Sequence, residues 1–361
     1  MVKDDKKKVG SSETTREASV FNFDIVQSFY CTCKKKTSCT TSEKKDKRVF
    51  LEWFVGFTEG DGSFALAIFP TIRNPYNMRP SFQITQKHPQ VLYRIKKELG
   101  FGTIVSITDR KTCRSYYRFS VYKLEHVRHL ILLFNGNLVI EKVQIRFAQW
   151  VKTYNDLCDQ RDKLISENLT KTVREPCIGL QESHYLAQQS SLTKVLLNLF
   201  TPQIDLDSAW LAGFTDAEGG FYGSLSPSKR HLTGFRERYK FYIPQKDGLE
   251  VLQRIAHLVQ TATFGKKALS STNLVAEIPG KPNVYRLEIS RLSSLEVLVE
   301  YLTRYPLLSK KQLVFVRWRR ILLRRDALKA QAVLSEKGMR RYKRMYGSIG
   351  KIREATETNL V

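Results

Sequence analysis

The spacing of apolar and polar residues predicts one series of helices and strands that occurs twice along the chain. The first series lies between residues 50 and 157. Apolar residues at helical spacing alternate here with segments in which every second residue is apolar, which is typical of strands. The pattern predicts a helix over about 50–61, strands near 64–68 and 82–86, a helix over 88–99, strands near 103–108 and 116–122, and helices over 123–134 and 139–157.

The same order returns between residues 207 and 327. It predicts a helix over about 207–218, strands near 221–225 and 241–245, a helix over 248–260, strands near 264–270 and 284–290, and helices over 292–303 and 309–327. Two runs of one order predict an α+β fold made of two pseudo-symmetric α-β-β-α-β-β-α half-domains.

The composition of the remaining segments predicts how the chain is divided. We expect half-domains at 49–159 and 205–328 and a linker at 160–204 that contains one helix near 192–200. The polar, Lys/Ser/Thr-rich residues 1–48 are expected to form a disordered N-terminal extension. Residues 329–361 are expected to form a basic tail that begins as a helix and then frays.

The helix that opens each run carries a repeated motif. The sequence WFVGFTEGDGSF at Trp53–Phe64 returns as WLAGFTDAEGGF at Trp210–Phe221. In each copy a glycine and a small residue four positions later lie on one helical face. Two such faces allow two helices to approach backbone to backbone. The repeat therefore predicts that the two motif helices pack against each other between the half-domains.

Each motif ends in a carboxylate, Asp61 or Glu218, followed by a glycine where the helix should stop. The carboxyl end of a helix is already negative, so an acid there is repelled. Packing the two helices together brings both acids and several unsatisfied carbonyls to one pole. Oxygen ligands of this kind suit Mg²⁺. We predict a metal site shared between the halves; the alternative is that both acids are capping or surface residues.

The charge of the chain indicates its class of partner. The net charge is +25, and the first 48 of the 361 residues hold 12 Lys/Arg and 7 Asp/Glu, so most of the excess lies in the globular part. A basic globular body favours a polyanion such as nucleic acid, although a general solubility charge or ribosome association would also produce it. The chain has no run of 18 apolar residues, so we expect no membrane partner.

The repeated motif resembles the helix signature of the LAGLIDADG homing endonucleases in their single-chain, two-motif form. The aligned cores are Phe54–Gly62 and Leu211–Gly219, and the resemblance covers roughly residues 50–325. It implies a saddle formed by two antiparallel sheets, with helices on one side and DNA on the concave side. A two-stranded ribbon or a sheet fits the major groove of DNA.

The resemblance also implies roles for the residues near the motifs. Asp61 and Glu218 would bind Mg²⁺, for which Mn²⁺ can substitute, with help from the carbonyls of Gly60 and Ala217. The strand-end glutamines would order water near the metal, and a lysine before the last long helix of each half would act on the water or the leaving group. These residues are Gln86, Gln245, Lys142 and Lys311, with Lys310 as the alternative in the second half. Polar strand ends and solvated lysines are the structural alternatives.

Alternation along the strands predicts which side chains face DNA, namely those opposite the inward-facing aromatic residues. They are Arg73, Gln83, Arg118 and Ser120 in the first half, and Tyr222, Ser224, Arg238, Lys240, Arg286 and Glu288 in the second, with Lys266 on a neighbouring strand. Arginine can read guanine and glutamine can read adenine, but many such contacts reach only phosphate or water.

The resemblance favours a monomeric, Mg²⁺-dependent endonuclease that cuts double-stranded DNA at a long nonpalindromic target and serves intron homing from a mitochondrial or chloroplast genome. The first alternative is a maturase that binds its host intron RNA and assists splicing of that group I intron. A transcription regulator with the same fold ranks last, because both acids are retained and no separate helix-turn-helix domain is evident.

Overall fold

A computed structural model of the chain describes residues 21–23, 41–68, 78–109, 113–172, 192–265 and 274–357. Arg73 and Lys266, two of the residues expected to contact DNA, lie outside the described residues, as do most of residues 1–48 and much of the expected linker. Within the described residues, every helix is too short or too polar to cross a membrane.

The first half contains one four-stranded antiparallel sheet in the order β1-β2-β4-β3, with helices packed on one face. Its elements are α2 (Thr41–Asp61), β1 (Gly62–Ile68), β2 (Met78–Gln86), α3 (Gln90–Leu99), β3 (Thr103–Thr108), β4 (Ser115–Val121), α4 (Leu124–Phe134) and α5 (Glu141–Thr172).

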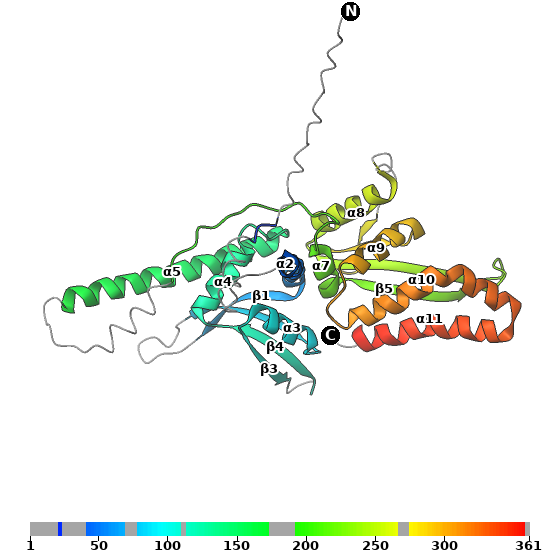
Figure 1. Cartoon of the computed structure of the whole chain (residues 1–361), viewed down its shortest axis with the longest axis horizontal. Coiled ribbons are helices and arrows are strands. Elements are labelled where there is room, and N and C mark those ends of the chain that lie inside the picture. Colours follow the sequence, from blue (N-terminus) through cyan, green and yellow to red (C-terminus); the bar gives the residue numbers. More distant parts are fainter. Residues whose placement is uncertain are drawn as a thin grey trace, which may run out of the picture.

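The second half repeats this plan with the sheet order β5-β6-β8-β7. Its elements are α7 (Trp210–Glu218), β5 (Gly220–Pro227), β6 (Phe235–Lys246), α8 (Leu249–Phe264), β7 (Val275–Glu277), β8 (Val284–Ile289), α9 (Leu292–Arg304), α10 (Lys311–Leu334) and α11 (Glu336–Glu357). Figure 1 shows the two halves on either side of the central helices α2 and α7. The predicted α+β fold of two matching halves is confirmed.

Alternating apolar residues place the strands on the helices in the same way in both halves. Phe64 lies opposite Phe82, and Phe221 lies opposite Phe241. Each pair packs against a long helix: Phe64 contacts Trp150 of α5, and Phe221 contacts Trp318 of α10, with tilted rings and 5.2 Å between ring centroids in both cases. The side chains that alternate with these aromatic residues along each strand lie on the opposite face of the sheet, which is called the open face below.

Several boundaries differ from the expected division of the chain. Helix α2 begins at Thr41, inside the expected extension, and Phe21 and Phe23 are buried in the core. Helix α5 continues beyond the expected boundary at residue 159 to Thr172. Residues 192–200 are not helical. The third strand of the second sheet is β7 rather than the expected 264–270, where α8 still includes Phe264.

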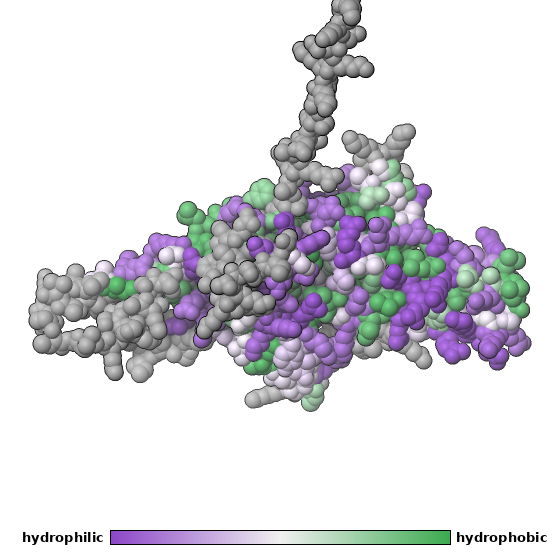
Figure 2. Space-filling view, viewed as in Figure 1, coloured by the Kyte–Doolittle hydropathy of each residue, from purple (hydrophilic) through white to green (hydrophobic). Residues whose placement is uncertain are grey.

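The basic C-terminal region begins as a helix, as expected, but this helix packs on the second half; residues 358–361, at the end that was expected to fray, lie outside the described residues. Helix α11 folds back along α10 and packs against β5. Its Tyr342 and Tyr346 are buried, and the Tyr342 hydroxyl donates to the Glu237 carboxylate at 2.9 Å. Basic side chains lie on the outer surface of this hairpin, where Figure 2 shows many hydrophilic groups. Arginine-rich sequence here hid two tyrosines spaced four residues apart, which face the sheet.

Candidate active site

Helices α2 and α7 pack directly against each other through their small residues, as the repeat predicted. A Cβ atom on Gly56 would lie 2.0 Å from the Trp210 carbonyl oxygen, and one on Gly213 would lie 1.9 Å from the Trp53 carbonyl oxygen. At the next turn, a Cβ on Gly60 would lie 2.4 Å from the Ala217 Cβ. Each of these positions requires glycine, and the close approach brings the two helices' carboxyl ends together.

Asp61 and Glu218 end these helices and line one cavity of about 600 Å³. Burial raises the pKa of Asp61. Burial, and then the charge of Asp61, raises the pKa of Glu218 to about 7. Two desolvated carboxyl groups that repel each other resist ionising together. A divalent cation between them would remove that penalty, since metal binding favours the deprotonated forms.

The two strand-end glutamines occupy matching places in the sheets but make different contacts. Gln86 lies opposite Tyr117, and Gln245 lies opposite Tyr285. The Gln86 amide donates to the Asp61 carboxylate at 2.7 Å. Gln245 is buried instead, and a Cβ on Gly248 would lie 2.3 Å from its Cγ. No hydrogen bond joins Gln245 to Glu218 in the described part of the chain, so only the first half brings its glutamine to its acid.

The lysines also differ between the halves. Lys311 Nζ donates to the Ala217 carbonyl at 2.6 Å, at the end of its own motif helix. Lys142 reaches across to the other half, where its Nζ donates to the Lys246 carbonyl. Burial lowers the pKa of Lys142, and Asp247 and Glu218 counteract that effect. Lys310, the alternative, contacts His88 of the first half at 3.0 Å rather than the motif helix.

A one-residue difference in length explains this contrast. Ile140 and Ser309 occupy the same place, because the backbone N–H of each donates to the buried acid of its own motif helix. From there the chain runs seven residues to Phe147 but six to Phe315. These two rings contact the matching residues Phe64 and Phe221, with ring centroids 5.2 and 5.4 Å apart. One residue turns a helical side chain by about 100°, so Lys142 and Lys311 point in different directions.

The second acids of the motifs, Glu59 and Asp216, face away from the shared cavity and are only 2 % and 3 % exposed. Burial raises the pKa of Glu59 to about 7, while hydrogen bonds from Ile140, Trp210 and Val139 counteract it. Burial likewise raises the pKa of Asp216. Each lies two residues before Asp61 or Glu218, a turn of about 200° along a helix, which places it on another helical face.

The oxygen atoms at the adjoining carboxyl ends of α2 and α7, called the shared pole below, suit a hard divalent cation. The described residues contain no cluster of three or more His, Cys, Asp or Glu side chains, so the two carboxylates and backbone carbonyls are the oxygen ligands at hand. Mg²⁺ is commonly held by one or two carboxylates together with water and substrate phosphate. The Ala217 carbonyl already accepts from Lys311, so its second lone pair would serve the metal.

The open face of the first sheet is mostly uncharged. Gln83 and Ser120 lie opposite each other on neighbouring strands, as do Thr85 and Arg118, whose Nε donates to the Thr85 hydroxyl at 3.2 Å. Ser120 was expected to be exposed, but it is only 3 % exposed and its hydroxyl has no protein partner. The neighbouring strands cover this small side chain, so that part of the expectation is wrong.

The open face of the second sheet is strongly basic. Ser224 lies opposite Arg238, Tyr222 lies opposite Lys240, and Pro244 lies opposite Arg286. Lys240 forms an ion pair with Glu288, and Arg286 lies over the Tyr242 ring. The Ser224 hydroxyl is buried without a protein partner, which differs from the expected exposure. The shared cavity continues onto this face, since its lining includes both acids together with Arg238, Lys240 and Arg286.

The sequence reading missed some residues of this site. Arg236 lies opposite Ser226 on the open face, two positions before Arg238, and the strand alternation could have found it. Tyr242 also lines the cavity. The backbone contacts of Glu59 and Asp216 carry no sequence signal, because they depend on loops more than 75 residues away.

Comparison with known proteins gives a consistent match. The family model described as LAGLIDADG endonuclease matches residues 54–154 and 211–322. The chain has the fold of the meganuclease I-CpaMI bound to uncleaved DNA, with a TM-score of 0.57, 18% identity and coverage of 82% of this chain and 98% of that one. The corresponding values for I-SmaMI, bound to an uncleaved DNA target in the presence of calcium ions, are 0.59, 16%, 83% and 98%.

Curated relatives are similar over most of this chain. A probable intron-encoded endonuclease of Neurospora crassa is 29% identical over 274 residues, which cover 75% of this chain and 39% of the relative. An uncharacterized mitochondrial protein of Saccharomyces cerevisiae, RF1, is 27% identical over 302 residues, which cover 75% of this chain and 54% of the relative. The chain thus spans about half or less of the length of these relatives.

Proposed function

Because this chain belongs to the LAGLIDADG endonuclease family, we propose that it is a site-specific endonuclease that hydrolyses both strands of duplex DNA and serves the homing of its intron. The observation that carries the proposal is the shared cavity. It joins two half-buried acids from the two halves to the basic open face of the second sheet. One site therefore combines oxygen ligands for a divalent cation with cations for a DNA backbone.

The proposed cofactor is Mg²⁺, with Mn²⁺ as a substitute, held by Asp61 and Glu218 with the Gly60 and Ala217 carbonyls. When bound, such an ion generates a nucleophilic water and stabilises charge on the phosphate. The chain's own residues fix the surroundings. Gln86 orients the Asp61 carboxylate at 2.7 Å, and Lys311 places a positive charge beside the same pole.

The proposed partner is a long nonpalindromic DNA duplex bound by a single chain. Two unlike open faces support a target whose halves differ in sequence, because each sheet would present its own side chains to the major groove. The name of the yeast relative supports a mitochondrial rather than a chloroplast origin. The maturase alternative is not carried forward, since RNA binding alone would not need both acids at the shared pole.

A cleavage assay tests the proposal. The purified protein is incubated in Mg²⁺ with an intronless allele of the host gene, with the intron-containing allele and an EDTA reaction as controls. The expected result is one linear product from the intronless allele alone, formed only in the presence of metal. If both alleles stay intact in Mg²⁺ and Mn²⁺ although the protein binds the intronless site, the nuclease proposal is wrong.

A further inference from the structure

We propose that Glu59 and Asp216 are positioning residues that hold the lysine-bearing loop of their own half and tie it to the tryptophan of the opposite motif helix. The inference rests on the proposed nuclease function for its consequence, but on hydrogen bonds for its geometry. Each acid, its loop and the opposite tryptophan are together called a clamp below.

The Asp216 clamp holds the loop that leads into α10. The Asp216 carboxylate accepts from the backbone N–H groups of Leu308 and Ser309, the latter at 3.1 Å, and from the Ser309 hydroxyl. The same hydroxyl oxygen accepts from the Lys311 backbone N–H at 3.1 Å. A continuous chain of hydrogen bonds therefore runs from Asp216 to Lys311, whose side chain reaches the Ala217 carbonyl.

The Glu59 clamp holds the matching loop before α5. One carboxylate oxygen accepts from the backbone N–H groups of Val139 and Ile140, both at 2.7 Å. Lys142 follows two residues later and reaches the Lys246 carbonyl in the other half. The two loops are thus fixed in the same way, although they deliver their lysines to different places.

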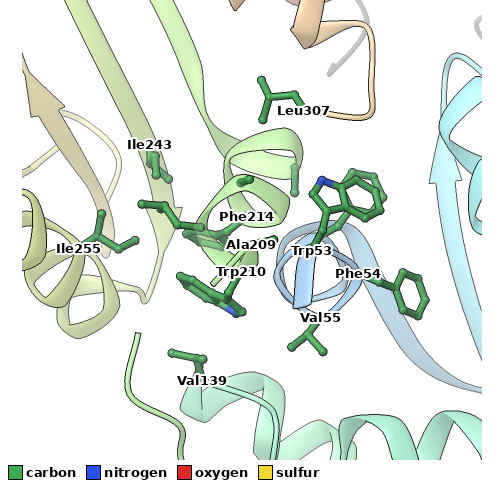
Figure 3. Packing of buried hydrophobic residues seen from close by; sticks show 14 of the residues in the cluster. Trp53, Phe54, Val55, Val139, Ala209, Trp210, Phe214, Ile243, Ile255 and Leu307 are labelled. Atoms are coloured by element: carbon green, nitrogen blue, oxygen red, sulfur yellow. The ribbon is translucent and has the colours of Figure 1, made fainter. Parts of the chain in front are cut away.

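Each clamp is closed by a tryptophan from the opposite half. Trp210 Nε1 donates to the second oxygen of Glu59 at 2.6 Å, and Trp53 Nε1 donates to Asp216 at 3.2 Å. Figure 3 shows Trp53 directed toward Leu307 and Trp210 directed toward Val139, on opposite sides of the helix pair. A change in the packing of α2 on α7 would therefore move both loops.

The number of donors explains why an acid is used. A carboxylate accepts through both oxygens, whereas an amide of the same shape presents an NH₂ group to at least one donor. Burying a carboxyl group costs free energy of desolvation that an apolar side chain does not incur, so adhesion between the helices does not require an acid. An acid is required because it binds the N–H groups of the loop backbone and of the opposite indole at the same time.

The test compares Asp216→Asn and Glu59→Gln with Glu52→Gln as the matched control. Glu52 is also a buried acid of the helix interface, and it accepts from the Ala209 backbone N–H at 2.9 Å. Glu52 belongs to α2 and contacts the amino end of α7, however, so it holds neither lysine loop. Ser309→Ala serves as a milder variant of the Asp216 clamp in case Asp216→Asn does not fold.

Two readouts separate positioning from general stability. Single-turnover cleavage is followed on each DNA strand separately at saturating protein and Mg²⁺, and the acetylation rate of each lysine is followed by mass spectrometry on the protein without DNA. We expect Asp216→Asn to slow one strand about 10- to 100-fold, the range for outer-shell partners of a metal site, and to raise the acetylation rate of Lys311. Glu59→Gln should raise that of Lys142 and slow the other strand.

The proposal is overturned if Lys311 and Lys142 keep their wild-type acetylation rates in these variants, or if each variant slows both strands equally. A wild type that cuts no duplex would count against the nuclease function alone. The acetylation rates would then still decide whether the two acids position the lysines.

Discussion

The two halves of this protein share one backbone plan but surround the shared acid pair with different groups. In the first half, Gln86 holds Asp61 while Lys142 reaches away to the other half. In the second half, Lys311 lies beside the motif helix while Gln245 is buried against Gly248. Pseudo-symmetry therefore places two acids at one pole, and the chemistry on either side of them is unequal. We expect the two DNA strands to be cut at different rates for this reason.

The open faces of the two sheets also differ, in their charge. The second sheet presents Arg236, Arg238, Lys240 and Arg286, whereas the first presents Arg79 and Arg118 among uncharged side chains. Half or more of the hydrogen bonds between proteins and DNA go to the phosphates and sugars, and Arg and Lys supply many of them. This contrast indicates that the second half supplies more of the salt-dependent affinity for a nucleic acid backbone.

The outer ends of the sheets differ as well. Helix α11 covers the outer part of β6, where Tyr239 is buried. On the matching part of the first sheet, Leu66, Ile68 and Met78 are 46%, 59% and 50% exposed. The last described helix is thus part of the core of the second half, and this half has a cover that the described part of the first half lacks.

Removing either shared acid should have the largest effect. Asp61→Asn and Glu218→Gln should each slow cleavage of both strands by more than about 100-fold, because losing a ligand exceeds the loss of an outer-shell partner. Binding of the duplex in Ca²⁺ should persist. Parallel cleavage and gel-shift titrations measure this; loss of only one strand in either variant would mean that the halves hold separate metals.

Replacing the lysines should have the second-largest effect on cleavage. Lys311→Met should slow cleavage about 10²- to 10³-fold, the range for removing one preorganised charge-stabilising group. Lys142→Met should have a smaller effect, because its amine is directed to the Lys246 carbonyl rather than to the carboxyl end of a motif helix. Single-turnover rates on each strand measure both, with Lys310→Met as the control. Equal effects of Lys311→Met and Lys142→Met would contradict the one-residue offset.

The glutamines should show a smaller contrast. Gln86→Ala removes a hydrogen bond to a carboxylate, typically about 1.5–3 kcal/mol, so cleavage should slow by roughly the matching factor of 10 to 150. Gln245→Ala should lower the free energy of unfolding and change the cleavage rate little. Urea unfolding alongside cleavage separates the two outcomes, and a larger rate loss for Gln245→Ala would reverse our assignment.

The smallest effects should come from the open faces. Arg238→Ala and Arg286→Ala should each reduce the salt slope of DNA binding by about 1, as expected for a lost phosphate contact. Val105→Thr, on the open face of the first sheet opposite Arg118, is the uncharged control and should leave the slope unchanged. Binding titrations between 50 and 200 mM salt, roughly the range over which such slopes are resolved, measure it.

Much of this architecture could be predicted from the sequence, because it depends on local patterns. Alternating apolar residues located β1, β2 and β4, and the repeated glycines predicted the contact between α2 and α7. The three-residue strand β7 is too short to show alternation. The buried tyrosines of α11 are hidden in a basic run, where charge suggested a solvated tail.

The contacts at the site were harder to predict, since they depend on distant segments. Alignment of the motifs paired Lys142 with Lys311, but the helices that follow differ by one residue in register, and only packing on Phe64 and Phe221 reveals it. The sequence likewise placed Gln86 and Gln245 at equivalent strand ends. Their unequal contacts depend on Asp61 in one case and on Gly248 in the other.

The most direct test of the account is to locate the metal. Crystals of the protein with its DNA target, grown in Mn²⁺, would be used to record anomalous diffraction at the manganese edge. We predict a manganese peak at the carboxyl ends of α2 and α7, coordinated by both Asp61 and Glu218. Manganese bound by only one of these acids, or bound elsewhere while both carboxylates remain without metal, would contradict the shared site.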